Sequence, residues 1–256
     1  MLRALIRSQQ WLSRKFDELL PASYRIDGNR DFLDSMVPAY LEENLHIADV
    51  GGGKNPYLSP DRKKQLAATV VGLDIDQSEL DRAPGGAYDE AICTDITAYR
   101  GRGDVDLVIC QAVLEHVADV EAAFTAIASL LRPGGTALLF VPSRNAVFAR
   151  LNNALPQRFK KWLLHSIYPE TRRNQGFPSY YHRCTPADFK QLAAANDLEL
   201  IEARYYYISS YFSFFFPLYF LWRLWILLFR AVRGDQAAET FSMAFRKKSR
   251  PGKPGS

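Results

Sequence analysis

The sequence is poor in cysteine and carries little excess charge. Its three cysteines, at positions 93, 110 and 184, are scattered and lack the spacing of metal ligands, so we expect reduced thiols and no metal site. The formal net charge is +4 over 256 residues, which does not suit a protein that binds nucleic acid through a basic surface. We therefore expect no nucleic-acid partner.

The N-terminus lacks the uninterrupted apolar run of a secretory signal, because charged and amide side chains break it up, and we expect a cytoplasmic location. Apolar residues instead recur at three- and four-residue steps from Leu2 to Leu20, which is typical of one face of an amphipathic helix. Pro21 is predicted to end it. We assign residues 1–40 to this helix and a lid.

Short apolar runs alternate with helical stretches in the middle of the chain. Strands separated by helices imply crossover connections, and hence a mainly parallel sheet with helices on both faces. Two later strands, Leu198–Tyr206 and Thr240–Arg246, would complete a seven-stranded, doubly wound, Rossmann-like α/β fold. A helix from about Val120 to Leu131 is predicted to end at the Arg-Pro-Gly-Gly turn of residues 132–135. The other strand candidates are residues 47–50, 69–73, 90–93, 105–110 and 136–141.

The remaining segments differ from this alternating pattern. Prolines interrupt residues 142–185, which also contain several aromatic residues, and we interpret them as a substrate-facing excursion of the main domain at 41–247. An apolar, aromatic stretch at 207–235 is predicted to be a helical insertion before the last strand. Residues 248–256 are predicted to be a disordered basic tail.

A glycine-rich turn, Asp49-Val50-Gly51-Gly52-Gly53, follows the first strand. Glycines let the backbone pass close to a ligand, and a carboxylate at a strand end can bind a cationic or hydroxyl-bearing group. About twenty residues further on, the second strand ends in Asp74, which is suitably placed for ribose hydroxyls. A tight turn without a ligand, and a helix cap at Asp74, are the alternatives.

Together these features resemble the class I S-adenosylmethionine-dependent methyltransferase family over about residues 45–205. The absence of G-x-G-x-x-G argues against a nicotinamide dehydrogenase. One departure is Asn55, where the family commonly has a third glycine; asparagine tolerates a left-handed conformation, so the turn is expected to survive. The resemblance implies S-adenosylmethionine as cofactor. By this resemblance, Asp49, Gly51 and Gly53 would contact the methionine part of the cofactor, and Asp74 with Ile75 would contact the ribose. Asp95 and Ile96 would contact the adenine, and Gln111 would lie on the sulfonium side.

Methyl transfer is an in-line displacement, so the protein must align the nucleophile and exclude water. A hydroxyl acceptor also needs a base, and His116 and His182 are the candidates. Glu115 is a third candidate, as a base or as a group that orients a histidine. Packing or a charge at a helix start would explain His116 and Glu115 equally well. The predicted substrate-binding residues flank His182 and are Tyr180, Tyr181 and Arg183.

The apolar insertion has no charged residue from Tyr205 to Trp222. It is too short to span a membrane twice, and the last strand must return to the same sheet, so we expect peripheral membrane contact through residues 207–232. The basic N-terminal helix and tail would add electrostatic attraction. Packing on the core or an interface in a homodimer is the alternative.

The sequence thus predicts a cytoplasmic methyltransferase, peripheral at a membrane, that methylates an oxygen on a lipophilic acceptor. A lipid-linked sugar or surface-glycan intermediate is the first choice of acceptor, and a quinone-like lipid the second. Two alternatives stay open: a methyltransferase of a soluble small molecule with the insertion as a dimer interface, and a non-catalytic, cofactor-binding scaffold.

Overall fold

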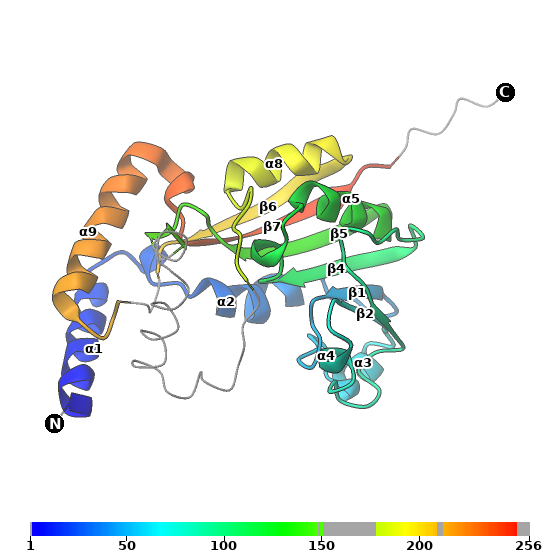
Figure 1. The fold of residues 1–256 in the computed structure, drawn as a ribbon, viewed down its shortest axis with the longest axis horizontal. Coiled ribbons are helices and arrows are strands. Elements are labelled where there is room, and N and C mark those ends of the chain that lie inside the picture. Colours follow the sequence, from blue (N-terminus) through cyan, green and yellow to red (C-terminus); the bar gives the residue numbers. More distant parts are fainter. Residues whose placement is uncertain (1, 148, 151–177, 209–211, 250–256) are drawn as a thin grey trace.

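The computed structural model of the protein has helices on both faces of one sheet (Figure 1). Most of the predicted excursion at 142–185 and of the predicted tail at 248–256 lies outside the described residues. The structure describes residues 2–147, 149–150, 178–208 and 212–249.

Seven strands form the sheet in the order β3-β2-β1-β4-β5-β7-β6. Only β7 runs antiparallel to its neighbours, β5 and β6, and the other pairings are parallel. This confirms the predicted doubly wound, mainly parallel fold. The strands are β1 (His46–Val50), β2 (Thr69–Asp74), β3 (Glu90–Cys93), β4 (Val105–Gln111), β5 (Leu131–Pro142), β6 (Leu198–Tyr206) and β7 (Thr240–Lys247).

Helices connect the strands and flank the sheet. The last helix before β6 begins as predicted, because the Thr185 hydroxyl accepts a hydrogen bond from the Asp188 amide at 3.2 Å and Pro186 occupies the first turn. The α-helices are α1 (Leu2–Glu18), α2 (Gly28–Asp31), α3 (Pro60–Gln65), α4 (Gln77–Leu80), α5 (Val120–Leu130), α8 (Pro186–Ala195) and α9 (Phe216–Arg233). Single turns of other helix types include a π-helical turn at Phe32–Met36 and 3-10 turns at Val37–Tyr40 and Leu114–His116.

The core lies on both faces of the sheet. On one face α5 and α8 pack through edge-to-face rings, with Phe124 and Phe189 5.0 Å apart between centroids. On the other face the segment after α2 packs Phe32 against Phe140 of β5, at 5.6 Å. Both faces are therefore covered, which explains why β1 and β4 are nearly continuous apolar runs.

The start of β5 differs from the predicted strand at 136–141. Val105 pairs with Leu131, whereas Leu107 pairs with Thr136, so the predicted turn at 132–135 is a bulge within the ladder and not a separate loop. The extra pairing at Leu131 also ends α5 at Leu130. The end of the helix was thus predicted to within one residue, but residues 132–135 belong to the strand and do not form a separate turn.

The apolar insertion is a helix, α9, that packs beside the N-terminal helix α1 (Figure 1). The ring of Phe16 lies edge-on to Phe220 with centroids 5.1 Å apart, and the Ser13 hydroxyl donates to the Ser213 carbonyl at 3.1 Å. A buried ion pair joins the helices, with Arg223 Nε 2.8 Å from Asp17 Oδ1. The two segments lie at opposite ends of the chain, so α1 is built into the fold through the insertion.

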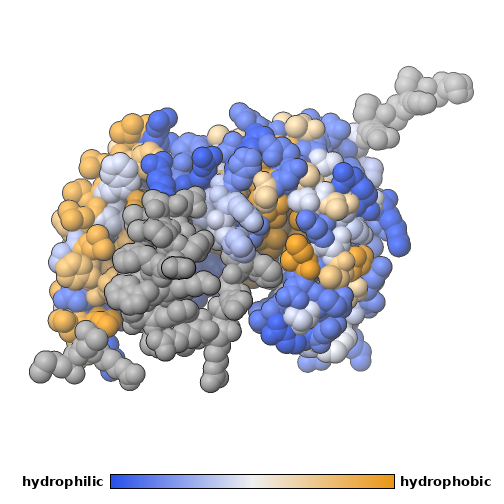
Figure 2. All heavy atoms as spheres, viewed as in Figure 1, coloured by the Kyte–Doolittle hydropathy of each residue, from blue (hydrophilic) through white to orange (hydrophobic). Residues whose placement is uncertain are grey.

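The outward sides of α1 and α9 form an apolar surface (Figure 2). On α1 the exposed apolar side chains include Leu5 and Trp11, each more than half exposed. Within the described residues, none of the helices has the length and apolar character needed to cross a membrane. The apolar face of α9 comprises Leu218, Leu221, Leu224, Trp225, Leu228 and Val232.

Candidate active site

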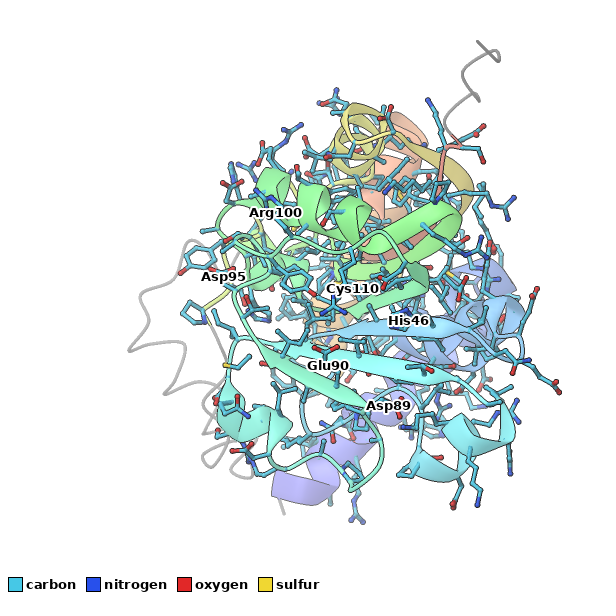
Figure 3. The ribbon with its side chains drawn as sticks, turned by 90° about the vertical axis from the view of Figure 1, so that its right-hand side faces the viewer. His46, Asp89, Glu90, Asp95, Arg100 and Cys110 are labelled. Atoms are coloured by element: carbon cyan, nitrogen blue, oxygen red, sulfur yellow. The ribbon has the colours of Figure 1, made fainter. Side chains whose placement is uncertain are left out.

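The predicted cofactor residues gather at one edge of the sheet. Figure 3 shows Asp95, which follows β3, at the opposite end of the strands from His46, which begins β1, and Asp89, which precedes β3. Asp74 and Gln111 are the last residues of β2 and β4. In open α/β sheets ligands bind in the crevice at the carboxyl ends of the strands, and these side chains line that edge.

The glycine turn is shaped by contacts that a side chain would prevent. Gly51 has φ +77°, and a Cβ there would lie 2.2 Å from Val113 Cγ2. Gly53 has φ +47°, and a Cβ there would lie 2.8 Å from Asp74 Oδ2. Because both positions lack a side chain, the backbone reaches the end of β2 and leaves room against Asp74 for a ligand.

The turn survives at Asn55 for a different reason than predicted. Asn55 is not in the left-handed region; its amide donates a hydrogen bond to the Gly52 carbonyl at 2.8 Å and closes the turn. The third glycine is therefore not needed for conformational reasons in this chain.

Asp49 supports the turn from beneath. Its side chain is buried and accepts hydrogen bonds from the Tyr57 amide at 2.8 Å and the Tyr88 hydroxyl at 3.5 Å. Burial raises the pKa of Asp49 to about 6. Tyr88 also donates to the Gly53 carbonyl at 3.1 Å. Sequence reasoning missed Tyr88; the signal was Gly72 inside β2, where a Cβ would lie 2.8 Å from the Tyr88 ring.

The ribose and adenine candidates follow along the same edge. Asp74 Oδ1 accepts from the Asp76 amide at 3.0 Å, and burial raises the pKa of Asp74. The next residue, Ile75, is 59% exposed, which suits contact with a nucleoside. Asp95 accepts from the Thr97 amide at 2.9 Å, and Ile96 is buried beside it. A glycine cradle, a carboxylate and an exposed apolar side chain together fit S-adenosylmethionine.

A cavity of about 680 Å³ begins beside this edge. Gln111 Nε2 donates to Asn29 Oδ1 at 2.6 Å, and Asn29 lines the cavity, so the predicted sulfonium side and the cavity meet at this pair. The volume of the cavity is in the range of small-molecule sites. The lining residues are Gln10, Ser13, Arg14, Asp17, Asp27, Gly28, Asn29, Glu115, His116, Phe140, Pro142, Ser179, Tyr181, Ile208, Ser213, Tyr219 and Thr240.

Glu115 and His116 face this cavity together. His116 Nδ1 lies 2.9 Å from the Pro178 carbonyl oxygen, which can only accept, so Nδ1 carries the proton and Nε2 of the neutral ring is the basic nitrogen. Nε2 lies 3.8 Å from Glu115 Oε1. Burial raises the pKa of Glu115 to about 8, and its Oε2 has no hydrogen-bond partner among the described residues. A histidine and a carboxyl group with a raised pKa thus line the same cavity.

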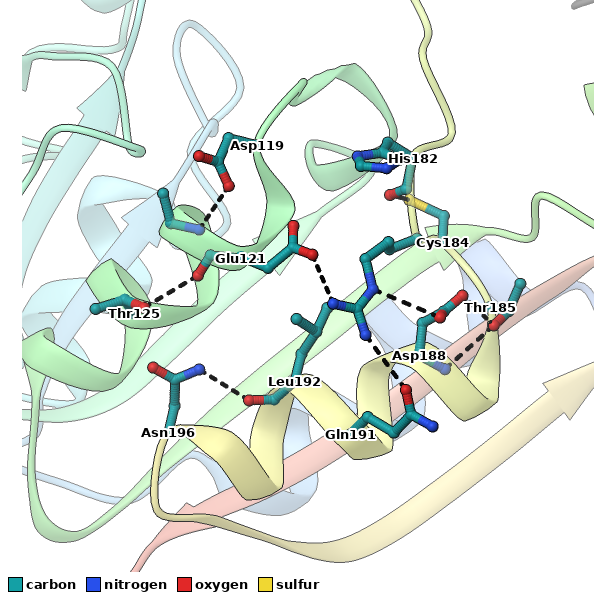
Figure 4. A network of polar contacts seen from close by, with 12 residues as sticks. Asp119, Glu121, Thr125, His182, Cys184, Thr185, Asp188, Gln191, Leu192 and Asn196 are labelled. Atoms are coloured by element: carbon teal, nitrogen blue, oxygen red, sulfur yellow. Dashed lines mark hydrogen bonds and ion pairs between the residues drawn. The ribbon is translucent and has the colours of Figure 1, made fainter.

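The segment at 180–183 divides its residues between the cavity and a separate polar network. Tyr181 lines the cavity, whereas Tyr180 is half-exposed and outside the lining. His182 Nδ1 bonds to the Ala118 carbonyl at 3.1 Å, and His182 also lies outside the lining. Arg183 lies 2.5 Å from Glu121 and 3.6 Å from Asp188, and Figure 4 shows these two carboxylates on α5 and α8. Of the three predicted base candidates, His116 and Glu115 line the cavity and His182 does not.

Backbone strain marks the same region. Ala112, directly after Gln111, has φ +53°, and Tyr181 has φ +52°. Such conformations are costly for residues other than glycine and collect at functional sites. Ala112 adjoins the cofactor edge and Tyr181 lines the cavity, and they are two of the six non-glycine residues with positive φ in the described part of the chain.

Sequence reasoning also missed the far wall of the cavity. Gln10, Ser13 and Arg14 come from α1, and Tyr219 comes from α9. The helical periodicity of α1 predicted its apolar face, and its basic residues were assigned to electrostatic attraction to a membrane and not to a cavity. The pairing of α1 with α9, which places these residues in the cavity, leaves no local sequence signal.

Comparison with known families matches residues 22–203 to a family described as a methyltransferase domain. The chain is 26% identical over 194 residues to a ubiquinone biosynthesis O-methyltransferase of Rhizobium johnstonii, covering 73% of each chain. It is 29% identical over 185 residues to a ubiquinone biosynthesis O-methyltransferase of Bartonella tribocorum, covering 69% of this chain and 68% of that protein.

Solved structures share the fold at low sequence identity. Phosphoethanolamine N-methyltransferase 2 of Haemonchus contortus, crystallised with S-adenosyl-L-methionine, superposes with a TM-score of 0.55 at 13% identity, covering 94% of this chain and 57% of that chain. The [4+2]-cyclase SpnF gives a TM-score of 0.53 at 15% identity, covering 89% and 86%. A fold shared with a cyclase does not fix the reaction, so the chemistry must be argued from the family and the site.

Proposed function

As a member of the methyltransferase-domain family, the chain is a class I S-adenosylmethionine-dependent methyltransferase, and we propose that it methylates a hydroxyl group on the polar head of a membrane-lipid acceptor. The observation that carries this proposal is the position of the cavity. It joins the cofactor edge at Asn29 and Gln111 and is walled by the same helices, α1 and α9, that carry the apolar surface.

The residues of the chain hold the hydroxyl and take its proton. S-adenosylmethionine, when bound, supplies an electrophilic methyl group. When that methyl group is transferred to the acceptor oxygen, His116 Nε2 would accept the proton of the acceptor hydroxyl. The Pro178 carbonyl holds Nδ1–H and fixes the tautomer that this step requires.

Glu115 contributes as a neutral acid. Burial raises its pKa to about 8, so it is mainly protonated at neutral pH. Glu115 borders the cavity beside His116, so its protonated carboxyl can donate a hydrogen bond to the acceptor and hold it next to His116. A neutral group in this position also avoids a negative charge where the acceptor oxygen becomes electron-rich.

The outer surface supports a lipophilic acceptor. Leu221 and Leu228 of α9 are 61% and 57% exposed, and Trp11 of α1 is 51% exposed, so two adjacent helices present apolar and aromatic side chains outward. Contact with a membrane through this face, within residues 207–232 and α1, would place the cavity beside the lipid surface. The acceptor could then enter the cavity with its tail still in the bilayer.

The cavity lining favours a polar head. Most lining side chains are polar or charged, including Gln10, Asn29 and Ser179, which suits several hydroxyl groups. A lipid-linked sugar or surface-glycan intermediate is therefore our first choice of acceptor. A quinone-like lipid is the second, favoured by the names of the relatives.

The reaction is tested with labelled S-adenosylmethionine and acceptors in vesicles: a prenyl-linked sugar and a prenylated catechol. We expect label on the sugar lipid, and His116→Gln should lower kcat/KM by roughly 10²–10⁴-fold without changing S-adenosylhomocysteine binding. His182→Gln is the matched control and should stay within a few-fold of wild type. Full activity of His116→Gln would remove His116 as the base; cofactor binding without turnover on any acceptor would support a scaffold.

The membrane contact is tested separately by flotation with vesicles. Replacing Leu221 and Leu228 by serine should release the protein, because each exposed apolar side chain contributes roughly 1.5–3 kcal/mol when buried. Ile201→Ser, on the edge strand β6, is the control and should not affect flotation. A wild-type homodimer in solution without lipid, dissociated by the same leucine variants, would assign this face to a dimer interface.

A further inference from the structure

The polar face of α1 is a wall of the acceptor cavity. Gln10, Ser13, Arg14 and Asp17 line the cavity, and spacings of three, four and seven residues place them on one side of the helix. The lining also includes His116 and Glu115 from the turn after β4. A ligand that fills this cavity therefore meets both the proposed base and α1.

The charges on the walls are unevenly satisfied. Asp17 is paired with Arg223 and accepts from the Tyr219 hydroxyl. Asp27 accepts from the Arg30 amide at 3.0 Å as the N-cap of α2. Arg14 has no hydrogen bond or ion pair with any residue in the part of the chain that the structure describes. The cavity thus contains one guanidinium that is available to a ligand.

We propose that Arg14 binds a phosphate group of the acceptor, so that the substrate is a phosphate- or diphosphate-linked lipid. A guanidinium binds phosphate through two parallel hydrogen bonds and matches its planar pair of oxygens. This inference rests on the proposed function and narrows its acceptor class.

The arrangement of α1 gives a physical reason for this assignment. In a phosphate-linked lipid the charge lies between the apolar tail and the hydroxyl-bearing head. The same helix presents Leu5 and Trp11 to the outer apolar surface and Arg14 to the cavity. Arg7, exposed two turns before Arg14 and about 10 Å from it along the helix, carries a second positive charge toward the helix start.

Direct binding tests the site without methyl transfer. Full-length protein saturated with S-adenosylhomocysteine is titrated calorimetrically with geranyl diphosphate and, in parallel, with geraniol, which lacks phosphate. Arg14→Gln should weaken geranyl diphosphate binding roughly ten- to hundredfold, as expected for a lost charge-assisted hydrogen-bond pair. Arg14→Lys should retain a large part of the affinity, and geraniol binding should not change.

Lys15→Gln is the matched control. It removes the same charge from the adjacent position, where Lys15 is half-exposed and paired only with Glu18 among the described residues, and Lys15 does not line the cavity. Geranyl diphosphate affinity should equal that of wild type. Equal affinity of wild type and Arg14→Gln, or equal loss in both variants, would overturn the proposal.

Two further arms separate the possible sources of the phosphate and the two proposals. If Arg14→Gln and Lys15→Gln weaken binding to anionic vesicles equally and geranyl diphosphate does not bind, the anion is a membrane headgroup and the proposal is wrong. If Arg14→Gln weakens geranyl diphosphate binding and Lys15→Gln does not, but no hydroxyl acceptor is methylated, the anion site is supported and the proposed reaction fails.

Discussion

The cofactor edge and the acceptor cavity are adjacent but are built in opposite ways. The cofactor edge uses backbone turns and strand ends from one stretch of chain, residues 49–111, at the carboxyl side of four parallel strands. The cavity uses side chains from segments spread between Gln10 and Thr240. The first is fixed by the sheet itself, whereas the second depends on how appended helices dock.

The docking of α1 on α9 shows this dependence. Arg223 is almost completely buried, bonds to Asp17, and also donates to the Tyr207 carbonyl at 2.5 Å and the Tyr24 carbonyl at 2.8 Å. One side chain thus ties α9, α1 and the segment between α1 and α2 together. Substitutions that disturb the docking of α1 on α9 should therefore alter the cavity and leave the cofactor edge intact. The following variants test whether the two regions respond independently.

Breaking the buried ion pair should have the largest effect. Asp17→Ala leaves Arg223 buried without its partner, and we expect a loss of about 3–5 kcal/mol in the free energy of unfolding, measured with urea. S-adenosylhomocysteine affinity of the folded protein should remain within a few-fold of wild type. Lys15→Ala, which removes an exposed pair with Glu18, should cost less than about 1 kcal/mol. Similar losses in both variants would show that α1 is not anchored by Asp17.

The second test uses pH. Burial raises the pKa of Glu115 from 4.5 to about 8. Below pH 4.5 the group is protonated in both states; above it the unfolded chain ionises first, so the free energy of unfolding falls until about pH 8 and then levels off. Glu115→Gln should remove a fall of about 5 kcal/mol over this window, at roughly 1.4 kcal/mol per pKa unit.

Asp49 and Glu239 contribute in the same direction, because burial raises their pKa values to about 6 and about 7. The variant should therefore keep part of the pH dependence. Urea unfolding at several pH values provides the measurement. A curve for Glu115→Gln that runs parallel to the wild-type curve would mean that Glu115 is ionised in the folded protein and is not the neutral acid of the cavity.

A substitution in the glycine turn should affect the cofactor side alone. Gly51→Ala introduces a Cβ 2.2 Å from Val113 Cγ2 at φ +77°, and backbone strain of about 1–3 kcal/mol adds to the clash. We expect calorimetric S-adenosylhomocysteine affinity to fall more than about tenfold. Gly134→Ala has a similar φ of +83° but open space around the new Cβ, so its affinity should not change. Unchanged S-adenosylhomocysteine affinity of Gly51→Ala would show that this turn does not contribute to cofactor binding.

The ribose contact should give the smallest effect. Asp74→Ala should weaken S-adenosylhomocysteine binding by about 1–3 kcal/mol through lost charged hydrogen bonds. Since burial raises the pKa of Asp74, wild-type affinity should begin to fall at a higher pH than for an ordinary carboxylate as the solution is acidified, and the variant should lack this fall. Asp76→Ala, at the N-cap of α4, is the control. Equal binding by both variants would remove Asp74 from the cofactor site.

Local patterns predicted much of the fold because they are local. The alternation of apolar runs and helices gave the parallel sheet, and the prediction of a helical insertion before β7 is confirmed by α9. The start of β5 was misplaced because Leu131 pairs with Val105, before the Pro-Gly-Gly sequence of residues 133–135 that would ordinarily lie between two elements. His116 and His182 could not be separated by sequence, since each bonds to a carbonyl more than 60 residues away in the chain.

By itself the sequence determined the fold class, the glycine turn and the acidic strand end, because each of these follows from the conformational limits of a few neighbouring residues. The tertiary structure decided which histidine faces the cavity, that burial raises the pKa of Glu115, and that the polar face of α1 lines the same cavity. Those outcomes depend on burial and on contacts such as Asp17 with Arg223, 206 residues apart. Pairings over such distances are selected by packing and desolvation in the folded chain and leave no periodic trace in the sequence.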